Sequence, residues 1–265
     1  MEPEPLTLLA EAIFAYIDEL SADSVDGYAE AQAAAEDLRR RRRQELTILL
    51  LRDPPVSATD IAAAAQAAGW KLPTQVAAAA SEDEALGAIA SRLPPDSLVT
   101  VVDGLGCVLM PDPEGPGRVD HLRRAASRGL LALGPATDLA GAARSWQLAK
   151  ELLHLAAGAE RQGLVRAEDH LADLLLSSNP HITSLLAARR LAPLDDLTPR
   201  AQSRMRETAL AYVRHHGNAV AMATELHVHP QTARYRIARL RELFGEDLDD
   251  PDARFELELA LRASA

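Results

Sequence analysis

The sequence contains a single cysteine, Cys107, among 265 residues. One thiol cannot form an internal disulfide, so no disulfide framework holds the fold, and a reducing compartment suits it. No apolar run approaches the roughly 18 residues needed to cross a membrane. The N-terminal sequence is acidic and lacks the basic start of a secretory signal. From these absences we expect a cytoplasmic protein with no membrane partner.

Aromatic residues are also scarce, at 3% of the chain. A surface that stacks the bases of single-stranded nucleic acid needs several exposed rings, so this composition argues against that class. Hydrophobic residues make up 48% of the chain, which is typical of globular proteins. The length is sufficient for two or three compact units, each with a core.

Charge is distributed unevenly along the chain. The formal net charge is −11, yet the segment from Arg200 to Phe244 holds eight Arg against three Glu. A locally basic segment in an acidic protein is what phosphate binding requires. This segment is therefore the expected place of a DNA-binding motif.

Two short apolar patterns separated by a turn follow one another between Asn218 and Phe244. The second begins near Pro230, because proline fits the first turn of a helix, where its missing N–H is not needed. Val228 lies in the turn. The spacing predicts a helix-turn-helix whose inward-facing residues are Ala219, Ala223, Leu226, Ala233, Ile237, Leu240 and Phe244.

The second helix, at about residues 230–244, is the expected recognition helix. Stepping about 100° per residue from Ile237 places one set of polar side chains on the opposite face or its flanks. We assign Gln231, Thr232 and Tyr235 to bases, and Arg234, Arg236 and Arg239 mainly to the DNA backbone. Arg234 is expected nearer the packed edge. The alternative is an ordinary amphipathic hairpin whose arginines form a solvated face.

At these residues the chain resembles the PucR and CdaR class of bacterial transcriptional regulators. The likeness runs from about Met205 to Arg262. It rests on His-Gly-Asn before the first helix, Leu-His-Val-His at the turn, Thr-x-x-Tyr-Arg in the second helix, and Asp-Leu-Asp-Asp-Pro followed by Leu-Glu-Leu-Ala-Leu. The resemblance implies sequence-specific binding of double-stranded DNA. This chain has Pro230-Gln231 where the family commonly has a basic residue and asparagine.

Upstream, the patterns predict a mainly helical α+β protein with a central ferredoxin-like antiparallel sheet. Strands are expected at Leu72–Ala80, in a hairpin at Leu98–Val102 and Cys107–Met110, and at Leu130–Leu133, with helices at Leu139–Ala157 and Gly163–Ser177. The expected domains are an N-terminal helical segment (1–53), the α+β domain (54–160), a helical connector (161–199) and an all-α helix-turn-helix domain (200–265).

The central region, roughly Gly69 to Gly158, resembles the degenerate GGDEF-like domain that precedes the helix-turn-helix in these regulators. A working cyclase of that type places paired carboxylates in the hairpin turn and a metal-binding acid on the first strand. Here the turn offers Asp103 alone, and Leu72–Ala80 contains no acid. We therefore expect no enzyme activity, no cofactor, no catalytic residue and no metal site.

Five consecutive arginines, Arg39–Arg43, could be a second nucleic-acid patch. We interpret them as a solvated helical surface, because five helical residues span more than one face and Glu36, Asp37 and Glu45 lie at ion-pair spacing.

The leading hypothesis is a DNA-binding transcriptional regulator. One recognition helix contacts few base pairs, so we expect a homodimer or higher oligomer, held together upstream of residue 200 through the stripes Leu6–Ile17 and Leu46–Leu50. The same upstream region is expected to sense a small-molecule effector of unknown identity. The alternatives are a nucleotide-binding or cyclase-type enzyme, and a helical interaction protein that does not bind DNA.

Overall fold

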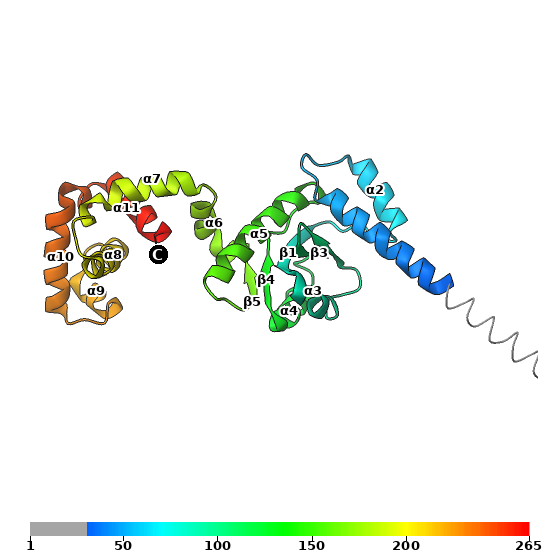
Figure 1. Ribbon diagram of the computed structural model, residues 1–265, viewed down its shortest axis with the longest axis horizontal. Coiled ribbons are helices and arrows are strands. Elements are labelled where there is room, and N and C mark those ends of the chain that lie inside the picture. Colours follow the sequence, from blue (N-terminus) through cyan, green and yellow to red (C-terminus); the bar gives the residue numbers. More distant parts are fainter. Residues whose placement is uncertain (1–30, 265) are drawn as a thin grey trace, which may run out of the picture. The chain divides into compact units, whose positions relative to one another are not determined.

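A computed structural model describes residues 31–264 of the chain. The chain divides into two compact units, Met1–Glu168 and Asp169–Ala265 (Figure 1). No helix within the described residues is long and apolar enough to span a membrane. The expected apolar stripe Leu6–Ile17 lies outside the described residues.

A five-stranded sheet forms the centre of the first unit, in the order β2-β3-β1-β4-β5. The strands are β1 (Val76–Glu82), β2 (Leu98–Val102), β3 (Leu105–Pro111), β4 (Leu130–Leu133) and β5 (Gly163–Arg166). β1 pairs antiparallel with β3 and β4, β2 pairs antiparallel with β3, and β4 pairs parallel with β5. The expected mainly helical α+β class, with its hairpin, is confirmed.

Two details of the expected sheet are wrong. The sheet is mixed rather than antiparallel, and β5 occupies the start of the range Gly163–Ser177 that was predicted to be one helix. The long helix α5 (Ala142–Gly158) supplies the crossover that a parallel pair requires. Residues 163–166 are too few to show a period-2 pattern, and the helix α6 begins only at Leu171 (Leu171–Ser177).

Helices cover both faces of the sheet. α5 packs against β1 and β4 (Figure 1). The opposite face packs against α3 (Asp83–Ala90) and α4 (Arg118–Ala125), where Ala77 and Ala79 of β1 join a core with Ile89 and Leu122.

β1 is rich in alanine, which has a low intrinsic strand propensity. Its burial explains why it is nevertheless a strand: Val76 to Ser81 are all buried between the two helical layers. Small side chains let α5 approach closely, and the Ser145 hydroxyl accepts the Ala78 N–H at 2.9 Å. Gly134 is required at the same crossing, since a Cβ there would lie 2.1 Å from the Ser145 carbonyl oxygen.

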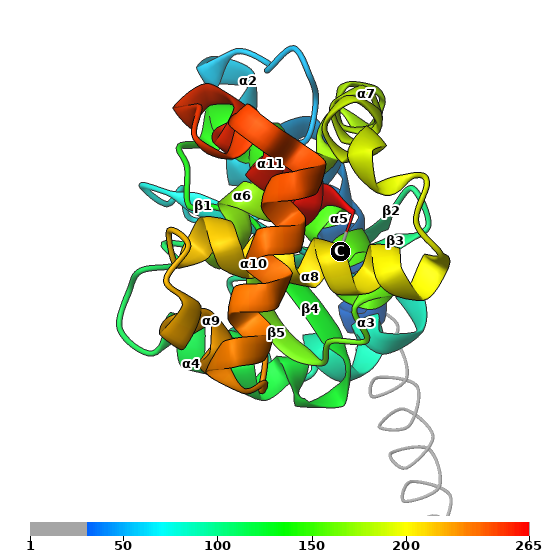
Figure 2. The ribbon, with the colours of Figure 1, turned by 90° about the vertical axis from the view of Figure 1, so that its left-hand side faces the viewer.

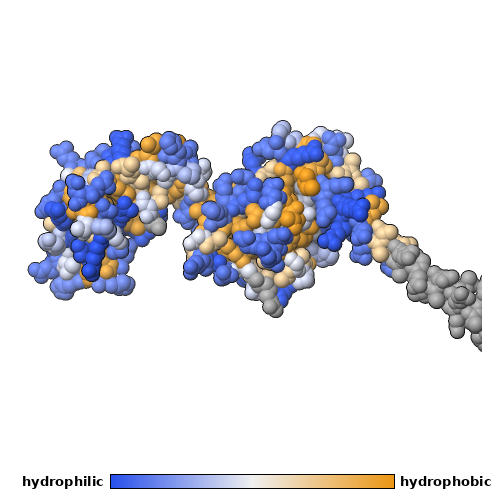
Figure 3. Space-filling view, in the orientation of Figure 1, coloured by the Kyte–Doolittle hydropathy of each residue, from blue (hydrophilic) through white to orange (hydrophobic). Residues whose placement is uncertain are grey.

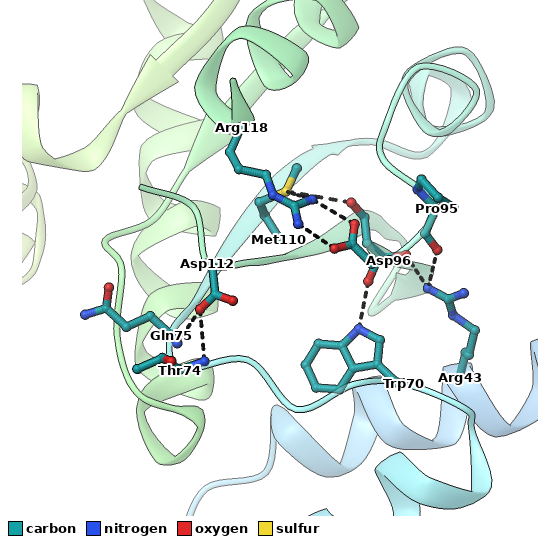
Figure 4. A network of polar contacts seen from close by, with 10 residues as sticks. Arg43, Trp70, Thr74, Gln75, Pro95, Asp96, Met110, Asp112 and Arg118 are labelled. Carbon is teal, nitrogen blue, oxygen red and sulfur yellow. Dashed lines mark hydrogen bonds and ion pairs between the residues drawn. The ribbon is translucent and has the colours of Figure 1, made fainter. Parts of the chain in front are cut away.

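A polar network joins the N-terminal helix to the sheet (Figure 4). Residues 31–50 are helical, and Arg43 of this helix donates to the carbonyl oxygens of Pro95 and Ser97 at 2.9 and 2.7 Å. Arg118 of α4 binds both oxygens of the Asp96 carboxylate, and the hydrogen bond holds the pKa of that carboxyl below its usual value. The indole of Trp70 donates to the Asp96 carbonyl at 2.7 Å.

The arginine run is divided between contacts with distant parts of the chain and solvent. Arg42 donates to the carbonyl oxygen of Ala67, at the end of the next helix, and Arg43 to those of Pro95 and Ser97, in the loop before β2. Arg39, Arg40 and Arg41 are exposed, which agrees with a solvated helical surface. The structure shows no ion pair between them and the acids at ion-pair spacing in the part of the chain it describes. The helix α2 (Ala58–Ala67) follows, capped by Ser57, whose hydroxyl accepts the Asp60 N–H.

The second unit is entirely helical in its described residues. Its helices are α6, α7 (Pro180–Leu191), α8 (Pro199–Arg214), α9 (Ala219–Glu225), α10 (Pro230–Phe244) and α11 (Pro251–Ala263). They enclose one core that includes Leu194, Tyr212, Met222, Leu240 and Leu257. Figure 2 shows α10 lying across α8 and α9, and both contact it.

α11 closes this core. Leu257, Ala260 and Leu261 are buried, whereas Phe255 is 63% exposed. The i, i+3, i+4 stripe of α11 is therefore rotated away from Phe255. α11 is further fixed to α7 because Arg190 donates to Glu256 at 2.7 Å.

Candidate nucleic-acid interface

The turn between α9 and α10 is fixed by backbone and side-chain caps at both ends. α9 ends in a Schellman arrangement, in which Val228 N–H donates to Ala223 O at 3.0 Å. His227 takes the left-handed conformation that this ending requires, with φ 51°. At the start of α10, Nδ1 of His229 accepts the Gln231 N–H at 3.2 Å. The direction of α10 relative to α9 is therefore set by local hydrogen bonds.

α9 is positioned against α8 in the same way. The Asn218 side chain caps α9 by accepting the N–H groups of Val220 and Ala221. Glu225, the last residue of α9, accepts from Arg214 at 3.0 Å and pairs with His215 at 2.5 Å. The bond with His215, and then that with Arg214, holds the pKa of Glu225 below its usual value. His215 is the C-cap residue of α8.

The buried face of α10 matches the predicted stripe. Ala233, Ile237, Leu240 and Phe244 are all buried. In α9, Ala223 is buried, while Ala219 and the C-cap residue Leu226 are partly buried against the core of the second unit. Met222, which the sequence pattern missed, is fully buried. A helix fixed along one whole face presents its other face in a definite orientation.

The predicted contact residues lie on that other face of α10. Gln231, Thr232, Arg234, Tyr235 and Arg239 are exposed, and Tyr235 reaches 72%. The structure thus brings Gln231, Thr232 and Tyr235 together on the first turns of α10.

The order of the two flanking arginines differs from expectation, because Arg236 is half-buried and Arg234 is exposed. The buried stripe is centred between Ile237 and the pair Ala233 and Leu240. That shift brings the Arg236 flank toward the core and turns Arg234 away from it.

Arg239 is held by an ion pair that sequence reasoning overlooked. Its guanidinium contacts the Glu242 carboxylate at 2.6 Å, an i, i+3 spacing readable in the sequence. Both side chains are largely exposed, so the pair is weak and can be exchanged for a phosphate. The structure shows no ion pair for Arg234 or Arg236 among residues 31–264.

The hairpin turn between β2 and β3 of the first unit is the alternative candidate site. Asp103 occupies the turn with φ 53°, and Glu82 ends the adjacent strand opposite Leu105. β1 (Val76–Glu82) therefore begins and ends later than the expected strand Leu72–Ala80, and an acid stands at its end. No group of three or more His, Cys, Asp or Glu placed to hold a metal occurs in the described part of the chain.

Cys107 is not available as a nucleophile. Its side chain is fully buried in β3, and burial raises the pKa of the thiol to about 12. The thiolate, which is the reactive form, is therefore essentially absent at neutral pH.

Comparisons with known proteins agree with this arrangement. The PucR C-terminal helix-turn-helix domain matches residues 205–263, a PucR-like N-terminal domain matches residues 1–51, and a GGDEF-like domain matches residues 52–155. The three matches follow one another along the chain and end at α11.

Two individual proteins are similar to this chain. The "uncharacterized protein in pkwA 5'region" of Thermomonospora curvata is 40% identical over 78 residues, which are 28% of this chain and 42% of that protein. The chain thus spans less than half the length of that curated relative. The crystal structure of a regulator of polyketide synthase expression from Bifidobacterium adolescentis is 20% identical, with 85% of this chain and 91% of that chain covered and a TM-score of 0.38. A TM-score this low does not establish a common overall arrangement.

Proposed function

We infer that this chain, which belongs to the PucR family of transcriptional regulators, binds double-stranded operator DNA with α10 in the major groove. The observation that carries the proposal is the exposed polar and basic face of α10, opposite a face that is buried along its whole length. A major groove admits one helix, and its bases are read from the helix's N-terminal turns.

Each exposed side chain has a role that fits its chemistry. Gln231 has the paired donor and acceptor that match adenine, Thr232 carries a methyl group suited to a thymine methyl, and Tyr235 extends beyond them. Arg234 and Arg236 bind phosphates. Arg239 also binds a phosphate, after exchanging its bond with Glu242.

Two copies of the chain are needed for specificity. One helix covers a few base pairs, and the handful of phosphate contacts it adds leaves a single module close to non-specific affinity, on the order of micromolar or weaker. A two-fold dimer places two helices in successive major grooves about 34 Å apart. We propose that the region upstream of residue 200 provides the dimer contact and the effector response.

The central domain acts in this scheme as a regulatory rather than a catalytic module. Asp103 is the only acid in the hairpin turn, and the paired carboxylates that would hold two metal ions around a triphosphate are missing there. The function of the α+β unit is then to position or to signal to the DNA-binding helices.

Selection from a random duplex library with the purified full-length chain tests the proposal. We expect enrichment of an inverted repeat whose half-site centres lie about 10 base pairs, or a multiple, apart. If no sequence is enriched and all duplexes bind equally weakly, the proposal is refuted. The alternative hypothesis, a helical interaction protein that does not bind DNA specifically, would then explain the result better.

A further inference from the structure

A hollow lies between the helices α8 and α11 within the second unit. Its volume is about 400 Å³, within the range of roughly 300–1,000 Å³ that is typical of small-molecule pockets. Figure 2 shows the end of α11 beside α8, and the two helices are in contact. Six of the lining side chains come from α8: Pro199, Gln202, Ser203, Arg206, Glu207 and Leu210.

The spacing along α8 explains why these six side chains meet at the hollow. They follow one another at alternating intervals of three residues and one, so they form one face of the helix. α11 adds Leu261 and its C-cap residue Ser264. The short side chains of Ser203 and Ser264 leave room between the two helices. Because the lining belongs to α8 and α11, the hollow is separate from the hydrophobic residues that Figure 3 shows along α7.

Arg206 has no acceptor in this arrangement. Its side chain is half-buried, and its Nε is buried without a hydrogen-bond partner. The structure shows no side-chain hydrogen bond or ion pair of Arg206 within residues 31–264. Glu207 follows it directly in the helix, where adjacent side chains do not face each other. A charged donor that is partly withdrawn from water without an acceptor costs folding free energy, which a bound ligand can recover.

We propose that the hollow binds a small organic acid, with its carboxylate on Arg206 and its apolar body against Leu210 and Leu261. A guanidinium binds a carboxylate through two parallel hydrogen bonds. Gln202 and Ser203, one turn before Arg206 on the same face of α8, offer neutral donors. Leu210 is half-buried and Leu261 is buried, so they form the apolar part of the wall.

The charges of the lining favour a single carboxylate over a phosphate group. Among the described residues that line the hollow, Arg206 is the one cation and Glu207 the one anion. A second negative charge on the ligand would find no further cation there and would be repelled by the Glu207 carboxylate. The inference goes beyond the proposed function, because it places a ligand site in the unit that carries α10, in addition to the effector response proposed upstream.

Saturation-transfer NMR on the full chain with 3-phenylpropanoate tests the proposal. The matched neutral probe is 3-phenyl-1-propanol, which has the same skeleton without the charge. For a ligand of about eleven non-hydrogen atoms we expect a dissociation constant on the order of a few millimolar. The alcohol should bind about tenfold more weakly, since it loses the charge-assisted hydrogen bonds to Arg206. Inorganic phosphate at the same concentration should not displace the acid.

Two variants locate the site. Arg206→Met removes the guanidinium and keeps a long apolar side chain, so it should weaken acid binding about tenfold. It should not lower the stability of the second unit, because the arginine loses no partner within the described residues. Ser203→Leu should fill the hollow and weaken binding of the acid and the alcohol alike. The matched control, Arg204→Met, changes an exposed arginine of α8 outside the lining and should leave binding unchanged.

Several results would overturn the proposal. These are the absence of acid binding at tens of millimolar, equal binding of acid and alcohol, displacement of the acid by phosphate, and binding that Arg206→Met or Ser203→Leu leaves intact or that Arg204→Met abolishes. A destabilised Arg206→Met variant in a denaturant titration would show that the arginine has a structural role instead. None of these measurements involves DNA, so the ligand site and the proposed function fail separately.

Discussion

Replacement of Arg236 by alanine should reduce the salt dependence of DNA binding by a defined amount. Arg236 is half-buried on α10 and forms no ion pair within residues 31–264, so its charge is available to a phosphate. Each phosphate neutralised contributes about 0.9 to the slope of log affinity against log salt. A dimer loses two contacts per operator, so the slope should shrink by about 1.8, and a bound monomer would lose about 0.9.

Fluorescence anisotropy titrations between about 50 and 200 mM salt measure this slope. Affinity for specific and random duplexes should fall alike, because a phosphate contact carries no sequence information. The matched control is Arg262→Ala in α11, which removes the same charge from an arginine paired with Glu258 and should leave the slope unchanged. Equal slopes for Arg236→Ala and the parent, or a loss confined to the specific site, would refute the phosphate role.

Three further predictions concern stability and catalysis. Gly217→Ala should lower the unfolding free energy of the C-terminal unit by about 2 kcal/mol in a denaturant titration, because φ is +74° and the added Cβ would lie 2.9 Å from the Tyr212 ring; no change would mean that the turn relaxes freely. The pKa of Glu225 is lowered in the fold by His215, so its contribution to stability is present above about pH 4 and is lost as the pH falls further. Glu225→Gln should flatten the acid limb of a melting-temperature profile, and an unchanged limb would exclude the contribution. The full chain incubated with GTP and Mg²⁺ should make no cyclic dinucleotide, since the turn at Asp103 lacks a second acid; product above a blank would restore the cyclase alternative.

The helix-turn-helix could be predicted because its signals are local. Proline at the first position of α10, the apolar repeat ending at Phe244 and the cap at Asn218 all act within one or two turns. The flank positions of Arg234 and Arg236 were harder to place, since they depend on where α8 and α9 contact α10. That contact shifts the buried stripe of α10 by a fraction of a turn. A helical wheel centred on Ile237 cannot show this shift.

The features that sequence reasoning missed depend on residues far apart in the chain. β5 is a strand because β4 offers a free edge after the α5 crossover, and four residues carry too little pattern to show it. Arg43 reaches the carbonyls of Pro95 and Ser97, more than fifty residues away. The exposed leucines of α6, Leu171 and Leu175, are spaced like a buried apolar stripe, so the sequence pattern does not show that they are exposed. The contact of α11 with α6 shows which side of α6 is covered.

Base preference is the property that tests the central claim most directly. Selection of binding sites with Gln231→Ala, Thr232→Ala and Arg236→Ala, compared with the parent, separates base reading from phosphate binding. The account predicts that Gln231→Ala and Thr232→Ala each relax the preference at one position per half-site, while Arg236→Ala keeps the parent motif at lower affinity. An unchanged motif in all three variants would contradict the placement of α10 in the major groove.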